Sequence, residues 1–238
     1  MSLIEYTLDE NVAFVSMNSG ENQFNPDFLN EYLEVLDEIE NNTNALTLVV
    51  TSRHEKIFSN GIDLDWLMPF VEKKDFKVLK SFLYRLNTMF KRTLTSPLIT
   101  IAALNGHAFA GGAIWACAFD FRFMRSERGY FCFPEADLKI PLLPGMLGLL
   151  KKAIPSQIME EMLYTGIRLT AEQCVDHHIV KEACHQDNLI EKTMRFAKSL
   201  NKNRMYVKEM RHRLYKDILF ALDVEDVSYI ESERLTVG

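Results

Sequence analysis

The sequence predicts an α/β fold, and three observations support that prediction. Short apolar runs rich in β-branched residues occupy 46–51 and 98–101, as buried strands do. Longer stretches beside them repeat apolar residues at helical spacing, which gives each stretch one apolar face. Strand-like and helix-like segments alternate along most of the chain, and residues from Asn188 onward are predicted to be helical with one interruption near 201–204. This alternation is typical of α/β proteins.

The N-terminal part is predicted to contain a strand and then a helix. Residues 12–17 (VAFVSM) have the composition of a strand. Asn25 followed by Pro26 is typical of a helix start, because Asn caps the first turn and Pro fits its first position. Apolar residues then recur at helical spacing as far as Ile39, and the Asn-rich segment 41–44 ends the helix.

The middle of the chain is predicted to hold one long helix. Apolar residues repeat at helical spacing between Asp75 and Leu94, and Pro97 ends the pattern. The preceding residues 65–74 form an amphipathic connection whose shape the pattern leaves open.

The segments after the second apolar strand are also assigned from pattern. Residues 112–118 are apolar and rich in Ala, which indicates a buried helix, and 119–124 alternate Phe with polar residues, which indicates a strand. Prolines and a glycine at 141–145 predict a rigid loop. Thr170 and Gln173 have the spacing of a capping box at a helix start.

Composition narrows the class of protein. The formal net charge of −6 gives no reason to expect a nucleic-acid partner, and no apolar run approaches the length of a membrane span. The first residues lack the basic start and apolar run of a secretory signal, so a cytoplasmic protein is expected. The cysteines have no metal-like spacing, and buried free thiols are the better interpretation: Cys117, Cys132, Cys174 and Cys184.

Two loops of small residues follow two of the predicted strands. The loop at 105–112 (NGHAFAGG) joins a strand to a helix N-terminus, where backbone N–H groups lack partners and the helix dipole adds partial positive charge. Such a place can bind an anion, or an oxygen that becomes one. Taken alone, this loop is explained equally well as an ordinary buried turn. The loop at 58–64 (FSNGIDL) follows the other strand.

Together these loops resemble the crotonase (enoyl-CoA hydratase/isomerase) superfamily, in which a Phe-Ser-x-Gly-x-Asp-Leu loop and an Asn-Gly-x-Ala-x-Gly-Gly loop form one site. The resemblance covers about residues 12–181. In that family one backbone N–H from each loop forms an oxyanion hole for the carbonyl of a coenzyme A thioester. Carried over by position, the resemblance implies the N–H groups of Asn60 and Gly111 as the donors.

The resemblance also implies an architecture and an assembly. It implies a ββα spiral over residues 1–187, followed by a C-terminal helical trimerisation segment over 188–238. A homotrimer or hexamer is expected, with an acyl-CoA as substrate. No metal and no separate cofactor are expected, because coenzyme A is part of the substrate.

The same family supplies a hypothesis for the catalytic base. Family members offer two glutamate positions, and here the later is Glu135, whereas the earlier is Ile114. Hydratases use both glutamates to hold water, and Δ3,Δ2-enoyl-CoA isomerases use the later one alone. An apolar Ile114 cannot orient water, and it would dry the surroundings of Glu135 and raise the pKa of that carboxyl. The pattern therefore favours an isomerase in which Glu135 moves the proton.

Substrate contacts are expected from both loops and from the segment 22–25, which resembles the family's Asn-Ala-Leu-Asn motif beside the nucleotide end of coenzyme A. A helix cap explains Asn25 equally well. The expected contact residues are Phe24, Ser59, Gly61, Ile62, Asp63, Gly112 and Ile114.

Several alternatives stay open. An enoyl-CoA hydratase or an acyl-CoA hydrolase could share the scaffold, and a non-catalytic homologue could bind coenzyme A or, through a basic C-terminal stretch, RNA. Asp137 is the second choice for the base, since an extended segment would place it on the same side as Glu135. His107 is interpreted as a packing residue. The chain departs from the family's usual glycines at Ala110 and Lys139.

Overall fold

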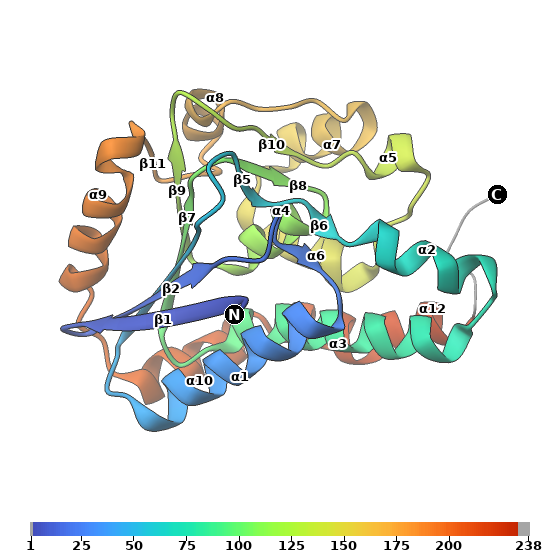
Figure 1. The fold of residues 1–238 in the computed structure, drawn as a ribbon, viewed down its shortest axis with the longest axis horizontal. Coiled ribbons are helices and arrows are strands. Elements are labelled where there is room, and N and C mark those ends of the chain that lie inside the picture. The colour runs from blue at the N-terminus through green and yellow to red at the C-terminus, as the bar shows by residue number, and fades with distance from the viewer. Residues whose placement is uncertain (1, 233–238) are drawn as a thin grey trace.

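The computed structural model describes residues 2–232, and a six-stranded sheet runs through its middle (Figure 1). The strands lie in the order β1-β2-β4-β7-β9-β11, with β1 antiparallel to β2 and every other pair parallel. Their bounds are β1 Ile4–Asp9, β2 Val12–Met17, β4 Thr47–Ser52, β7 Ile99–Leu104, β9 Phe121–Arg125 and β11 Glu182–Cys184. The strands predicted at 12–17, 46–51, 98–101 and 119–124 are therefore all present, within two residues at their starts.

Shorter strands form two smaller sheets. Strand β3 (Gln23–Phe24) pairs with β6 (Gly61–Ile62), and β8 (His107–Phe109) lies between β5 (Ile57–Ser59) and β10 (Phe131–Cys132). Each of β2, β4, β7 and β9 is followed by a short strand of a smaller sheet and then by a helix. This repeated order is the expected ββα spiral.

Two helices begin where the sequence predicts. Helix α1 (Pro26–Asn42) begins at the predicted cap, where Asn25 accepts a hydrogen bond from the Phe28 N–H, and α3 (Phe76–Thr95) is capped by Asp75. The open segment 65–74 contains α2 (Leu64–Glu72), which tolerates a proline inside it. The remaining helices of the core are α4 Gly111–Ala118, α5 Glu135–Leu138, α6 Pro144–Ala153, α7 Ser156–Thr165 and α8 Ala171–Asp176.

The C-terminal helices divide between two faces of the core. Helix α9 (Gln186–Ser199) packs on the main sheet. The segments that follow pack on α3 and α6: α10 (Arg204–Leu214), α11 (Lys216–Phe220), the short π-helix η1 (Ala221–Glu225) and α12 (Asp226–Glu231). Figure 1 shows α9 beside β11 and α12 beside α3. Residues 233–238 of the predicted trimerisation segment lie outside the described residues. Trimerisation itself remains a prediction.

Asp226 joins the C-terminal helices to the core. Its buried carboxylate accepts hydrogen bonds from the Gly145 N–H at the start of α6 and from the Asn87 side chain on α3, each at 2.8 Å. Removing an acceptor from two buried donors leaves both unsatisfied. We therefore expect Asp226→Ala to lower the free energy of unfolding by about 2–4 kcal/mol, measured by urea denaturation.

Asp223, on the neighbouring π-helix η1, provides a matched control. It pairs with Lys91 at the surface, where its side chain is 48% exposed. Exposed ion pairs contribute about 0–1 kcal/mol, so Asp223→Ala should change stability little. Equal losses from the two substitutions would contradict a structural role for the buried carboxylate.

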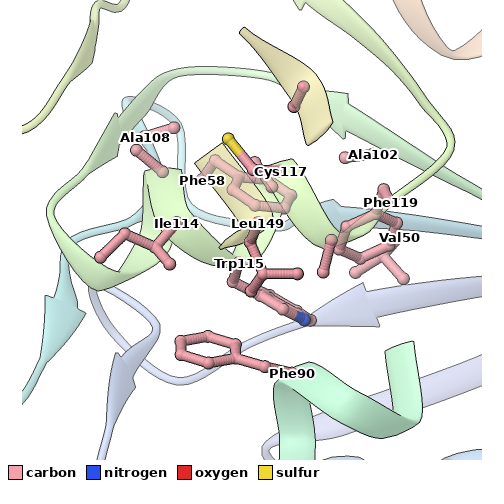
Figure 2. Close-up of a cluster of buried hydrophobic side chains, with 14 of the residues drawn as sticks. Val50, Phe58, Phe90, Ala102, Ala108, Ile114, Trp115, Cys117, Phe119 and Leu149 are labelled. Atoms are coloured by element: carbon pink, nitrogen blue, oxygen red, sulfur yellow. The ribbon is translucent and has the colours of Figure 1, made fainter. Parts of the chain in front are cut away.

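The largest core cluster is centred on α4. All the side chains of this helix are buried, and Figure 2 shows Trp115 between Phe58 and Phe90, with Phe119 and Leu149 close by. Within residues 2–232, no helix combines the length and the apolar composition needed to cross a membrane. The same residues contain no group of three or more His, Cys, Asp or Glu side chains placed to hold a metal ion.

Candidate active site

The two predicted loops meet in the structure. A Cβ atom added to Gly61 would lie only 2.5 Å from the Gly111 backbone nitrogen, and Gly61 has a φ of +78°. A side chain there would therefore force the loops apart, and the positive φ also favours glycine. Gly112 is equally confined, because an added Cβ would lie 2.3 Å from the Ser59 carbonyl oxygen. The close approach joins the first loop directly to the N-terminus of α4.

The donor predicted in the first loop is wrong. The Asn60 N–H donates to the Glu21 carbonyl oxygen at 3.2 Å, and the Asn60 side chain also bonds Glu21, so this amide is not free for a ligand. The Asp63 N–H donates to Phe24 in β3 at 3.0 Å. Successive amides of a strand point to opposite sides, so the Ile62 N–H faces away from β3.

The Ile62 amide instead faces the second loop. Its nitrogen lies 3.4 Å from the position that a Cβ on Gly111 would occupy. Gly111 is the first residue of α4, and the opening amides of a helix have no acceptor within it. The amides of Ile62 and Gly111 are therefore the pair that lie side by side with free N–H groups available, and the helix dipole adds partial positive charge beside them.

The small sheet that contains β8 and β10 connects the second loop to the segment that leads into Glu135. The Ala110 N–H, one residue before Gly111, donates to the Cys132 carbonyl oxygen at 3.0 Å. Three residues after Cys132 the chain reaches Glu135, the first residue of α5. Glu135 is 7% exposed, and the Oε2 atom of its side chain has no hydrogen-bond partner among the described residues.

Burial raises the pKa of Glu135 to about 7, against the opposing effect of a hydrogen bond from its own backbone amide. A carboxyl with this pKa is present in both protonation states near neutral pH, so it can take up a proton and return it. The predicted increase in pKa is thereby confirmed. Ile114, which the sequence predicts to exclude water from the surroundings of Glu135, lies on α4 and is 2% exposed.

Asp137 and His107 are placed as packing or surface groups. Residues 135–138 form a helical turn and not an extended segment, so Asp137 is exposed and lies against Gly166. The reasoning that put it beside Glu135 is therefore wrong. The centroids of the His107 and Phe109 rings lie 4.9 Å apart, and burial lowers the pKa of His107, which fits a packing residue.

Several expected substrate contacts are structural residues here. Phe24 and Ser59 are fully buried, and the Ser59 hydroxyl donates to Asn22 and accepts from the Gly61 N–H. Asp63 caps α2 by accepting from the Trp66 N–H. Their side chains therefore help to hold the loops in place, and their contact with a substrate stays a prediction. Gly61, Ile62, Gly112 and Ile114 remain next to the paired amides or on α4.

Two residues at positions where the family usually has glycine adopt backbone angles that favour glycine. Ala110 has φ +49° and ψ −128°, and Lys139 has φ +56° and ψ +33°. Non-glycine residues in these regions are strained by about 1–3 kcal/mol. Ala110→Gly and Lys139→Gly should each raise the free energy of unfolding by about 0.5–1 kcal/mol, since glycine's greater freedom in the unfolded chain offsets part of the gain.

Lys151→Gly is the control for these two glycine substitutions, and urea denaturation measures the stability of all three variants. It is exposed inside α6 with ordinary helical geometry, so Lys151→Gly should lower stability by about 1 kcal/mol. Higher stability of Lys151→Gly, or lower stability of both Ala110→Gly and Lys139→Gly, would contradict the claim that Ala110 and Lys139 are strained.

A profile of the enoyl-CoA hydratase/isomerase family matches residues 7–231. The chain belongs to the enoyl-CoA hydratase/isomerase family. Among characterised relatives, Enoyl-CoA delta isomerase 3 of Arabidopsis thaliana is 32% identical over 186 residues, which is 76% of each chain. Carnitinyl-CoA dehydratase of Salmonella typhi is 35% identical over 152 residues, covering 64% of this chain and 56% of the relative.

Solved structures agree with the family's crotonase fold. An enoyl-CoA hydratase/isomerase family protein from Pseudomonas syringae superposes with a TM-score of 0.87 at 21% identity, covering 96% of this chain and 97% of that one. An enoyl-CoA hydratase from Mycobacterium marinum gives 0.85 at 20% identity, over 97% and 99%.

Proposed function

We propose that this protein is an enoyl-CoA isomerase that moves a double bond from position 3 to position 2 of an acyl-CoA thioester. The observation that carries the proposal is the pairing of two backbone amides, from Ile62 and Gly111, with one buried carboxyl of raised pKa, Glu135. The similarity to a delta isomerase supports the choice of reaction. The reaction needs no separate cofactor, because coenzyme A arrives as part of the substrate.

The proposed mechanism uses each group once. The thioester oxygen accepts hydrogen bonds from the Ile62 and Gly111 amides, and the Glu135 carboxylate removes a proton from C2. The electron pair of that C–H bond forms the C1–C2 double bond of an enolate, whose negative oxygen the amides stabilise. The electron pair of the C3–C4 double bond then takes the proton back from Glu135 to form the new C4–H bond. At the same time the C1–C2 pair becomes the C2–C3 double bond, and the enolate oxygen re-forms the thioester carbonyl.

The runner-up activity is hydration, which the family also includes. Addition of water across a double bond needs a group that holds and activates that water. The position that supplies a second glutamate in hydratases is Ile114 here, whose apolar side chain cannot do this. The similarity to a carnitinyl-CoA dehydratase is the observation that favours this alternative, so hydration is tested beside isomerisation.

An isotope experiment distinguishes the two reactions and reports on the base. A 3-enoyl-CoA carrying deuterium at C2 is incubated with the protein in ordinary water, and the product is analysed by mass spectrometry and NMR. One carboxyl acting on both carbons predicts a 2-enoyl-CoA with part of the deuterium at C4. The proposal fails if the protein hydrates crotonyl-CoA faster than it isomerises the 3-enoyl substrate, or if it converts neither.

We also propose that the protein forms a homo-oligomer through α10 to α12. This part of the surface exposes several large apolar side chains, and contiguous exposed apolar patches mark interaction surfaces. They are Met205, Tyr206, Met210, Leu214, Phe220, Val224 and Tyr229. Light scattering after size exclusion should give the mass of a trimer or hexamer, and Leu214→Glu should lower it; a monomeric wild type would contradict the proposal.

RNA binding by the basic C-terminal stretch is less well supported. Many of its cations already have partners within the chain: Lys198 pairs with Asp9 and Glu10, and Arg211 with Asp120. Arg204 donates to backbone carbonyl groups of the core. Cations held in this way are not available to phosphate groups. RNA retention that falls steeply with salt would revive this alternative.

A further inference from the structure

Trp115 lies one helical turn beyond the Gly111 amide, on the same helix. It is fully buried and has aromatic neighbours on several sides. Its ring stacks on Phe58 with centroids 5.7 Å apart and meets Phe24 edge-on, also at 5.7 Å. Figure 2 shows Trp115 and Ile114 leaving α4 in different directions, so the indole points into the core.

Those two phenylalanines support both ends of the first loop. Phe58 lies in β5 at the start of the loop, and Phe24 holds the other end because its carbonyl oxygen accepts the Asp63 N–H. Phe24 also reaches the second loop, since its Cε2 atom is 3.4 Å from where a Cβ on Gly111 would lie. One indole ring on α4 is therefore packed between residues that fix the position of the Ile62 amide.

The indole is held in place by a buried hydroxyl. Its Nε1–H donates to Thr93 Oγ1 on α3 at 3.0 Å, and the Thr93 hydroxyl itself donates to the Met89 carbonyl oxygen at 2.9 Å. Because the Thr93 proton is thereby used, Tyr32 is the donor in its 3.0 Å contact with Thr93. The bond from Trp115 fixes how α4 is rotated relative to α3.

We propose that Trp115 is a positioning residue that sets the separation between the Ile62 and Gly111 amides. The inference rests on the proposed function, because it assigns the purpose of that separation to the thioester oxygen. Both amides must lie within hydrogen-bond reach of one oxygen at the same time. A displacement of about 1 Å in such an arrangement can reduce a rate by about 100-fold.

Three substitutions separate positioning from simple packing. Trp115→Phe removes the N–H and part of the ring. Thr93→Val keeps the shape of the threonine side chain and removes its hydroxyl, which accepts from Trp115, so it tests the same bond if Trp115→Phe folds poorly. It also removes the acceptor of the Tyr32 hydroxyl, and the Tyr32→Phe control measures the loss of that second bond by itself. Tyr32→Phe is the matched control, because it deletes a hydroxyl from the same network and leaves the bond between Trp115 and Thr93 in place.

Two readouts are measured on each variant. The first is kcat and KM for a 3-enoyl-CoA. The second is the infrared carbonyl band of bound hexanoyl-CoA carrying ¹³C at its thioester carbon, a saturated ligand that cannot isomerise. Hydrogen bonds from two amides polarise the carbonyl group and lower this frequency in the wild type. Thermal unfolding records how far each substitution weakens the core.

We expect Trp115→Phe and Thr93→Val to lower kcat by about 10- to 100-fold with KM changed less than about threefold, and to return the carbonyl band towards that of free ligand. Tyr32→Phe should keep both readouts near wild type. Variants that lose thermal stability but keep the wild-type kcat and carbonyl band would overturn the inference alone. A wild-type protein that leaves the band unshifted would overturn the proposed function, and the inference with it.

Discussion

Replacing Glu135 with Gln should lower kcat for isomerisation by about 1,000-fold, because the amide cannot accept the C2 proton. Asp137→Asn is the matched control. It makes the same change two residues away on an exposed side chain, and it should leave kcat within about threefold of wild type. Steady-state kinetics with a 3-enoyl-CoA measure both. Near wild-type turnover by the Glu135 variant would exclude this carboxyl as the base.

The pH dependence of the wild type should report the same group. Burial raises the pKa of Glu135 to about 7, and only the ionised form can remove a proton. The value of kcat/KM should therefore rise tenfold per pH unit below about 7 and level off above it. A profile that levels off near pH 4.5, the ordinary value for glutamate, would show that the working carboxyl is an exposed one.

Glu135→Gln should raise the free energy of unfolding near neutral pH, although it lowers activity. The folded protein binds the Glu135 proton more tightly than the unfolded chain, so this carboxyl favours folding below about pH 4.5 and loses that contribution as the pH rises to about 7. Gln does not titrate. Relative to wild type, Glu135→Gln should gain up to about 3 kcal/mol between pH 4 and pH 8 in urea titrations.

Gly61→Ala should reduce kcat by about 100-fold and also destabilise the protein. Its Cβ would lie 2.5 Å from the Gly111 nitrogen, so one loop must move and the paired amides separate. Losing one donor of an oxyanion hole lowers rates by about 100- to 1,000-fold. The clash and the positive φ together should lower the free energy of unfolding by about 2–4 kcal/mol.

Gly20→Ala separates the effect of backbone strain from the effect of the steric clash. It too has a positive φ, +52°, but nothing lies within 4 Å of an added Cβ. Gly20→Ala should therefore cost about 1 kcal/mol of stability and leave kcat unchanged. If the two alanine variants have the same kcat, the contact between the loops does not position the catalytic amides.

The sequence predicted the elements that carry strong local signals. Helix starts at Asn25 and Asp75 follow from capping chemistry, which acts within a few residues. Short strands such as β3 and β6 have only two residues and therefore no periodicity to detect. The pattern over 65–74 leaves the shape of that segment open, and the structure forms α2 there with Pro69 inside the helix.

The site was predicted less completely than the fold, for a physical reason. Sequence similarity brought the two loops together, but it does not tell which amide of a loop faces the ligand. That depends on the pairing of β6 with β3, which points the Ile62 N–H towards Gly111, while Asn60 bonds Glu21. The extended geometry assumed for Asp137 failed similarly, because a short helical turn at 135–138 changes which residues share a side.

The most direct test is a crystal structure with a non-reactive acyl-CoA bound. We expect the thioester oxygen to lie about 2.7–3.1 Å from the nitrogens of both Ile62 and Gly111, with a Glu135 oxygen about 3–3.5 Å from C2. A thioester oxygen bound by the Asn60 amide, or by neither loop, would contradict this account, as would a Glu135 carboxyl turned away from the ligand.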